Sequence, residues 1–105
     1  MKLIDCEVQV SMEASMRMLH LCPVKDETDD GTVKVCWMTN GSTIELHSLA
    51  EYLSEFATVA ITHEDLVDQI AEDIAKVAKG SIQEISVSFT GFTAGMSIQA
   101  ESWPS

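Results

Sequence analysis

The sequence contains little positive charge. Its 105 residues include six Lys and Arg against 17 Asp and Glu, which gives a formal net charge of −11. An acidic surface of this kind repels phosphate backbones, so the composition argues against tight nucleic-acid binding through a broad basic face. A small neutral ligand or a protein partner is easier to accommodate on such a molecule.

The sequence also lacks long apolar runs, so we expect no membrane span. The first ten residues, MKLIDCEVQV, carry acids where a secretory signal needs an unbroken apolar stretch, and we expect no export signal. The three cysteines form no Cys-x-x-Cys pair and have no zinc-ligand spacing. We therefore expect free thiols in a reducing, cytoplasmic compartment, and no metal site.

The patterns that are present predict strands in the first part of the chain. Apolar and polar residues alternate over 3–10, with Cys6 on the side expected to enter the core. Methionines of one parity over 12–20 extend this strand or follow a bulge. A loop is expected over 23–31, which contains proline, glycine and acids, and a second strand over 32–38.

Two helices are predicted in the middle of the chain. Ser48 and Glu51 have the spacing of a capping box, so the first helix is expected to begin at Ser48. Thr62 is expected to cap the second helix and Gly80 to end it. The apolar stripe of this second helix comprises Leu66, Val67, Ile70, Ile74, Val77 and Ala78.

Two further strands, over 85–89 and 96–100, flank TGFTAG, which predicts a hairpin loop. The order is β-β-α-α-β-β, which predicts one α+β domain over residues 1–105, with an antiparallel sheet and both helices on one face. Such a sheet has edges that need partners, and copies of the chain joined edge to edge could close into a barrel.

Cys22 lies in an unusual setting, LHLCPVKDETDDG, where a proline and then several acids follow it. An inert buried thiol is one interpretation, since free cysteines are among the most buried residues. A nucleophile is the other, because a nearby carboxyl group can protonate an atom that gains negative charge when a thiolate attacks, as the nitrogen of a nitrile does. The acids within eight positions are Asp26, Glu27, Asp29 and Asp30.

Three other residues have both a structural and a functional interpretation. Glu64 can complement the dipole of the second helix, or can accept paired N–H donors from a purine-like ring. His63 beside it is either a surface residue or part of the same site. Glu45, between a short extended piece and a helix, is either surface charge or a pocket residue, and Ser48 is most simply a helix cap.

Four segments together resemble the 7-cyano-7-deazaguanine reductase (nitrile reductase) family, which has the tunnelling fold. LCPVKDETD resembles the family's LCP-x5-D signature, with Cys22 and Asp29 at its two functional positions. THEDLVDQIAEDI resembles its FHED helix start, with His63 and Glu64. IELHSLAEYL and FTGFTAGMSI are similar to its VESKSLKLYL and FTPRGGISI segments, and all four occur in order over residues 15–100.

Two departures from that family concern its cofactor. The lysines of ESKSLK and the arginine of PRGG are associated with the NADPH phosphates, whereas this sequence has His47 and Ala50 at the lysine positions and no arginine in TGFTAG. In this respect the sequence resembles the reductase-like archaeosine synthases, which lack the NADPH motif and add ammonia to the nitrile. The resemblance thus implies an amidinotransferase with no cofactor and with ammonia as co-substrate.

The resemblance also implies the role of each site residue. Cys22 would form a covalent thioimide with the nitrile carbon, and Asp29 would protonate the nitrile nitrogen. Glu64, with His63, would bind the edge of the deazaguanine base. In this family neighbouring subunits build each pocket together, and the homo-oligomer is a multimeric tunnel, often decameric. The opposite wall of the pocket would consist of Ile44, Glu45 and Leu46.

The resemblance leaves open whether the base is free, within tRNA or within DNA. A net charge of −11 is unfavourable for binding tRNA, unless the protein comes from a high-salt cell or a basic patch forms around Arg17, Lys25 and Lys34 in the assembly. Two other functions stay open as alternatives. One is NADPH-dependent reduction of the same nitrile, and the other is a non-catalytic module that only binds a purine-like ligand or a partner protein.

Overall fold

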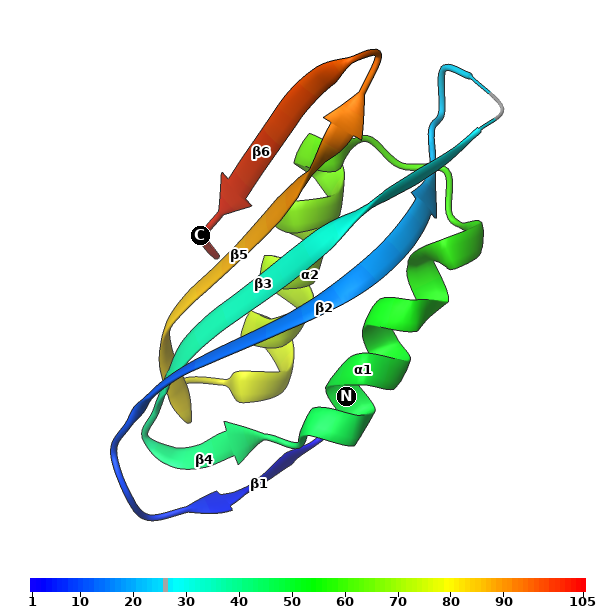
Figure 1. Ribbon diagram of the computed structural model, residues 1–105. Helices are drawn as coiled ribbons and strands as arrows, with labels where there is room; N and C mark the ends of the chain where they lie inside the picture. The colour runs from blue at the N-terminus through cyan, green and yellow to red at the C-terminus, as the bar shows by residue number, and fades with distance from the viewer. Residues whose placement is uncertain (26) are drawn as a thin grey trace.

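A computed structural model describes residues 1–25 and 27–105, and Asp26, one of the acids noted after Cys22, lies outside the described residues. Figure 1 shows a twisted sheet with two helices packed against it. The elements in chain order are β1 (Leu3–Cys6), β2 (Ser11–Leu21), β3 (Thr28–Thr39), β4 (Gly41–Ile44), α1 (Leu46–Ser54), the 3₁₀ helix η1 (Glu55–Thr58), α2 (His63–Ala78), β5 (Ile82–Thr93) and β6 (Met96–Ser102).

The main sheet is antiparallel, with strand order β2-β3-β5-β6, and β1 pairs with β4 in a separate two-stranded sheet. Apart from that small sheet, the order is the predicted β-β-α-α-β-β, and the predicted α+β class is confirmed. No helix in the described part of the chain is long and apolar enough to cross a membrane.

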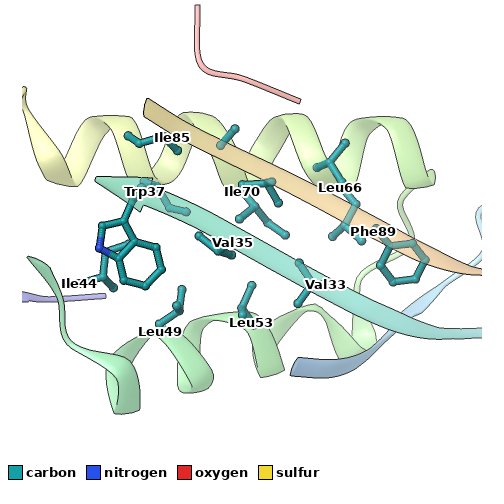
Figure 2. Close-up of a cluster of buried hydrophobic side chains, with 14 of the residues drawn as sticks. Val33, Val35, Trp37, Ile44, Leu49, Leu53, Leu66, Ile70, Ile85 and Phe89 are labelled. Carbon is teal, nitrogen blue, oxygen red and sulfur yellow. The ribbon is translucent and has the colours of Figure 1, made fainter. Parts of the chain in front are cut away.

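The core lies between the main sheet and the two helices, as Figure 2 shows. Val33, Val35 and Trp37 alternate along β3 and are each at most 1% exposed, because every second side chain of a strand points to the same face. The even-numbered residues of β2 and, from Ile85 onward, the odd-numbered residues of β5 point the same way. The helices close this core with Leu49, Leu53, Leu66, Ile70 and Ile74.

The prediction of one half-buried strand over 3–10 is wrong. β1 ends at Cys6, and the apolar side of the pattern is exposed at Ile4, Val8 and Val10. Cys6 is only half-buried, so it is not the core residue that the alternation predicted. The physical reason is that β1, which pairs only with the four-residue β4, packs its other face, the one with Leu3, against the core.

Both predicted loops are shorter than expected. β3 begins at Thr28, so the loop predicted over 23–31 ends before its last acids, which belong to a strand. Similarly, β5 and β6 extend through most of TGFTAG, and only Ala94 and Gly95 form the turn, with φ of 53° and 77°. Positive φ at both central residues is typical of the two-residue hairpin turn whose twist matches the flanking strands.

The start of α1 also differs from the prediction. Glu45, and not Ser48, caps this helix, because its carboxylate accepts hydrogen bonds from the backbone N–H groups of His47 and Ser48. The hydroxyl of Ser48 instead donates to the Glu45 carbonyl and accepts from the backbone N–H of Lys2. A helix that begins at Leu46 needs its side-chain acceptor one position earlier, which is Glu45.

The second helix agrees closely with its prediction. Thr62 caps α2, accepting a hydrogen bond from the backbone N–H of Asp65 at 3.1 Å. At the other end Lys79, with φ of 48°, takes the left-handed position expected of Gly80. Val77 is 37% exposed and does not belong to the buried stripe.

The Glu45 cap predicts a pH dependence of stability. The backbone N–H of His47, first among several donors, holds the pKa of Glu45 below its usual value of 4.5. A depressed folded-state pKa stabilises the fold above the unfolded pKa, and this contribution is lost as pH falls through the folded pKa. We expect the stability difference between the parent and Glu45→Gln to be full near neutral pH and to shrink below about pH 4.5.

Urea unfolding at a series of pH values measures that difference. Glu51→Gln, an exposed carboxylate on the same helix, is the matched control and should show no such trend. A parent-minus-Glu45→Gln difference that stays constant through the acidic range would contradict the capping role.

Candidate functional site

The register of the β2–β3 hairpin places two predicted site residues at one end of the molecule. His20 lies opposite Asp29 and Leu21 lies opposite Thr28, so the loop begins at Cys22. His20 and Asp29 both point toward the helices, and they are 0% and 7% exposed. Asp29, the second residue of β3, therefore has a buried carboxyl group and lies on the same hairpin as the thiol of Cys22.

The loop holds Cys22 at its start. The backbone N–H of Cys22 donates to the Glu27 carbonyl at 2.9 Å, which closes the loop. The backbone N–H of Lys25 points at the Cys22 sulfur from 3.5 Å. The side chain is half-buried, and a half-buried thiol with an N–H aimed at it suits a nucleophile better than an inert core residue.

The segment before α2 is anchored to the same end of β2. The backbone N–H of Leu21 donates to the Val59 carbonyl, and that of Ile61 donates to the Leu21 carbonyl, both at 3.0 Å. Because α2 begins two residues later, this bridge brings His63 and Glu64 to the hairpin end. Glu64 is exposed in the first turn of the helix, whereas the His63 side chain is only 12% exposed and turns inward.

His63 turns toward a buried cluster that includes His20 and Asp29. Nε2 of His20 lies 3.1 Å from Nδ1 of His63, and Nε2 of His63 lies 3.0 Å from the Thr93 hydroxyl oxygen. Oδ2 of Asp29 is 3.8 Å from Nε2 of His63 and 4.0 Å from Nε2 of His20. Burial, and then the neighbouring His63, lower the pKa of His20, so its neutral form is favoured.

Phe89 supports this cluster from the sheet. Its ring stacks on that of His63, with centroids 5.0 Å apart and planes 16° apart, and meets the edge of His20 at 5.4 Å. Gly31 makes room for it, because a Cβ at Gly31 would lie 2.4 Å from Cζ of Phe89 and 2.4 Å from the Thr90 carbonyl oxygen. The position of His63 therefore depends on a glycine in the neighbouring strand.

The sequence did not identify His20, Thr93 or Phe89 as site residues. His20 precedes Cys22 by two positions and lies on the buried side of β2. Its place in that alternation is the sequence signal that could have identified it as a site residue. Thr93 lies in the TGFTAG stretch that was predicted as a loop, so its inward direction could not be inferred before β5 was seen to include it.

The other predicted wall residues lie well away from Cys22 along the molecule. Leu46 shares a groove with Ala14 and Met16 of β2, which stand six to eight residues before Cys22, or about 20–26 Å of strand. Ile44 is buried in the core and Glu45 caps α1, while Leu46 is 52% exposed and lines an apolar groove of about 210 Å³ with Ala14, Ser15, Met16, Leu49, Ala50 and Leu53. A single protomer does not bring this wall to Cys22.

A family model described as "QueF-like protein" matches residues 28–99 of this chain. The chain belongs to the QueF-like family.

Curated relatives of this QueF-like chain are NADPH-dependent 7-cyano-7-deazaguanine reductases. The one from Prochlorococcus marinus is 28% identical over 68 residues, which cover 65% of this chain and 49% of the relative. The one from Chloroherpeton thalassium is 32% identical over 59 residues, or 56% of this chain and 51% of the relative. The chain thus spans about half the length of these relatives.

A solved structure also shares the fold. The crystal structure of an archaeosine synthase described as QueF-Like, in its apo form, matches with a TM-score of 0.79 over 88% of this chain and 90% of that chain, at 15% identity. The likeness confirms that this QueF-like chain has the tunnelling fold.

The positions at which reductases are associated with NADPH phosphates do not fit that cofactor here. His47 is almost fully exposed, with 97% of its side chain accessible, and Ala50 carries no charge. The β5–β6 turn has exposed Phe92 near it and contains no arginine. A dinucleotide phosphate needs charged, preferably bidentate donors, which these residues do not supply.

The buried cluster offers donor atoms of a kind that metals accept. His20, Asp29 and His63 each place one ligand atom within 4.8 Å of the others. Bonds of about 2.0–2.1 Å to a tetrahedral ion would separate ligand atoms by about 3.3 Å, so Asp29, at 4.0 Å from His20, would have to move. An ion there would also replace the contact between the two imidazoles.

We expect Gly31→Ala to disturb the cluster through Phe89. The added methyl group overlaps the ring, so the free energy of unfolding should fall by about 1–3 kcal/mol and the ring-proton shifts of His63 should change in NMR spectra. Gly91→Ala is the matched control, because its Cβ would stay 3.2 Å from the same ring and should perturb it less. Equal effects of the two substitutions would refute this packing role.

Proposed function

We propose that this QueF-like protein is an amidinotransferase-type enzyme that adds ammonia to the nitrile of a 7-cyano-7-deazaguanine base. The observation that carries the proposal is the meeting of Cys22, buried Asp29 and the start of α2 at one end of the sheet. Family membership supports the substrate class, and the shared fold with the archaeosine synthase described above is consistent with the reaction.

In the proposed reaction the Cys22 thiolate attacks the nitrile carbon and forms a C–S bond. The π electrons move to the nitrogen, which takes a proton from Asp29, and a thioimide results. Ammonia then adds to the same carbon, and collapse expels the thiolate. The surplus proton of ammonia returns to Asp29, leaving a neutral formamidine and regenerated Cys22. The backbone N–H of Lys25 points at the Cys22 sulfur from 3.5 Å and helps to hold it in place.

Recognition of the base is assigned to the start of α2. Glu64 is exposed there, and its two carboxylate oxygens can accept the ring N–H and exocyclic amino group of a guanine-like edge. His63 is turned inward, so its part in recognition is to shape the floor beside Asp29. Ile44, Glu45 and Leu46 would come from a neighbouring protomer, since Leu46 lies beside Ala14 and Met16, about 20–26 Å of strand from Cys22 in its own chain.

Reduction of the same nitrile with NADPH is the second candidate, because the curated relatives carry that activity in their names. The poor fit of His47, Ala50 and the β5–β6 turn to phosphates argues for ammonia instead.

The charge distribution bears on whether the base is part of a polymer. Arg17 pairs with Asp30, and Lys34 lies 3.7 Å from Glu13, so two of the three cations proposed for a basic patch face carboxylates in the protomer. These exposed pairs do little for stability, but they cancel charge that a phosphate backbone would need. We therefore favour the free base as the first substrate to test.

Intact-protein mass spectrometry tests the nucleophile. The protein is mixed with 7-cyano-7-deazaguanine, without ammonia or NADPH. The mass of one substrate should be added to Cys22, because the thioimide intermediate has no second reactant to convert it to product. Cys22→Ala should abolish the gain, whereas Cys36→Ala, which removes another half-buried thiol, should retain it. No adduct, together with unchanged binding by Cys22→Ala, would indicate a non-catalytic binding module.

Separate incubations with ammonium and with NADPH test the second step. We expect a formamidine product with ammonium and no oxidation of NADPH, because no phosphate-binding cations lie at the expected positions. An aminomethyl product with NADPH consumption would favour the reductase. The same incubations with a 7-cyano-7-deazaguanine-containing tRNA or DNA fragment identify the form of the substrate.

Mixing two inactive variants tests whether the pocket is shared. Suppose that Cys22 and Leu46 of one site come from different protomers. Equal amounts of Cys22→Ala and Leu46→Arg chains, refolded together, should then recover about a quarter of the parent activity per site, because random assembly joins an intact Cys22 to an intact Leu46 at about one site in four. Leu46 is exposed in the protomer, so Leu46→Arg should fold. Mixtures as inactive as their components would place both halves of the site in one chain.

A further inference from the structure

His20 is a buried titratable group that the proposed reaction does not use. It is 0% exposed, although imidazole is usually only partly buried, and it lies two residues before Cys22 and opposite Asp29. Its Nε2 lies 3.1 Å from Nδ1 of His63. Its own Nδ1 has no hydrogen-bond partner in the part of the chain that the structure describes.

Two tautomeric arrangements fit the contact between the imidazoles, because a single proton lies between the two nitrogens. In the first, His20 donates from Nε2–H and its Nδ1 is a bare lone pair. His63 then accepts at Nδ1 and carries its proton on Nε2. In the second, His63 donates from Nδ1–H, and His20 carries a proton on its unpartnered Nδ1.

The surroundings favour the first arrangement. The second buries an N–H donor of His20 that meets no acceptor in hydrogen-bonding geometry among the described residues, and orphaned buried N–H groups are rarer than orphaned acceptors. It also turns the Nε2 lone pair of His63 toward Oδ2 of Asp29, 3.8 Å away. In the first arrangement the Nε2–H of His63 donates to the Thr93 hydroxyl and turns a positive hydrogen, in place of a lone pair, toward the Asp29 carboxyl.

We propose that His20 is a positioning residue that holds His63 in the Nε2–H tautomer. His63 then donates its Nε2–H to Thr93, and the positive end of that N–H lies 3.8 Å from Oδ2 of Asp29, which favours the transferable proton on Oδ1. His20 touches neither substrate nor reacting atoms, and it acts through the 3.1 Å contact with His63. The inference about the reaction rests on the proposed nitrile chemistry, whereas the inference about the tautomer does not.

Imidazole ¹⁵N chemical shifts and long-range ¹H–¹⁵N couplings report the tautomer directly. In the parent we expect His63 with a protonated Nε2 and an unprotonated Nδ1, and His20 with the same pattern. His20→Phe keeps a ring against Phe89 but removes the donor, so His63 should shift toward the Nδ1–H form. His20→Gln can place an amide N–H near the position of Nε2 and should restore the parent pattern.

The rate of Cys22 adduct formation is the second readout. His20→Phe should slow the adduct about five- to tenfold, because one neutral hydrogen bond is lost, and His20→Gln should recover most of the rate. Thermal unfolding of each variant separates this effect from loss of fold. Met12→Leu, on the same face of β2, serves as the matched substitution and should leave both readouts unchanged.

The outcomes distinguish the two proposals. A parent His63 protonated on Nδ1, or a His20→Phe variant with an unchanged tautomer of His63, would overturn the role of His20 whatever the activity. A shifted tautomer with an unchanged adduct rate would overturn its role in the reaction. Absence of any adduct on the parent protein would overturn the nitrile chemistry and leave the tautomer result intact.

Discussion

The register of β2 against β3 is the constraint on which the candidate site depends. It places His20 opposite Asp29 and ends the pairing at Leu21, so that Cys22 opens the loop. A slip of one residue would turn every side chain of β2 to the other face, moving His20 to solvent and Leu19 into the core. The buried parity of Met18 and His20 against Val33 and Val35 therefore sets both the core and the candidate site.

A second constraint ties the helices to that register. Leu21 exchanges hydrogen bonds with the segment between η1 and α2, so the start of α2 is positioned by the last residue of β2. The same arrangement sends β3 away from the site for its full length before β4 and α1 begin. The fold thus keeps the Cys22 thiol away from Ile44, Glu45 and Leu46 at the start of α1. A pocket that uses both requires two chains.

Strand parity and helix periodicity predicted much of this from sequence. The alternation of Val33, Val35 and Trp37, and the Thr62 cap of α2, depend on local spacing and are found in the structure. Choices that depend on tertiary neighbours were missed. Glu45 and Ser48 both have a side chain that can cap a helix, and only the end of β4 decides between them. His20 counts as polar in any hydropathy pattern, so its burial becomes visible only once His63 and Phe89 surround it.

The burial of His20 is better explained by function than by stability. Methionines occupy the two preceding inward positions of β2, Met16 and Met18, so an apolar side chain suits this face. An imidazole there leaves one nitrogen without a partner among the described residues, which costs about 1–3 kcal/mol, and places a carboxyl group and two imidazoles in one desolvated cluster. Buried, closely spaced titratable groups of this kind are concentrated at functional sites. That cost is offset if the cluster orients Asp29 beside the thiol, which gives the buried histidine pair a physical reason to exist.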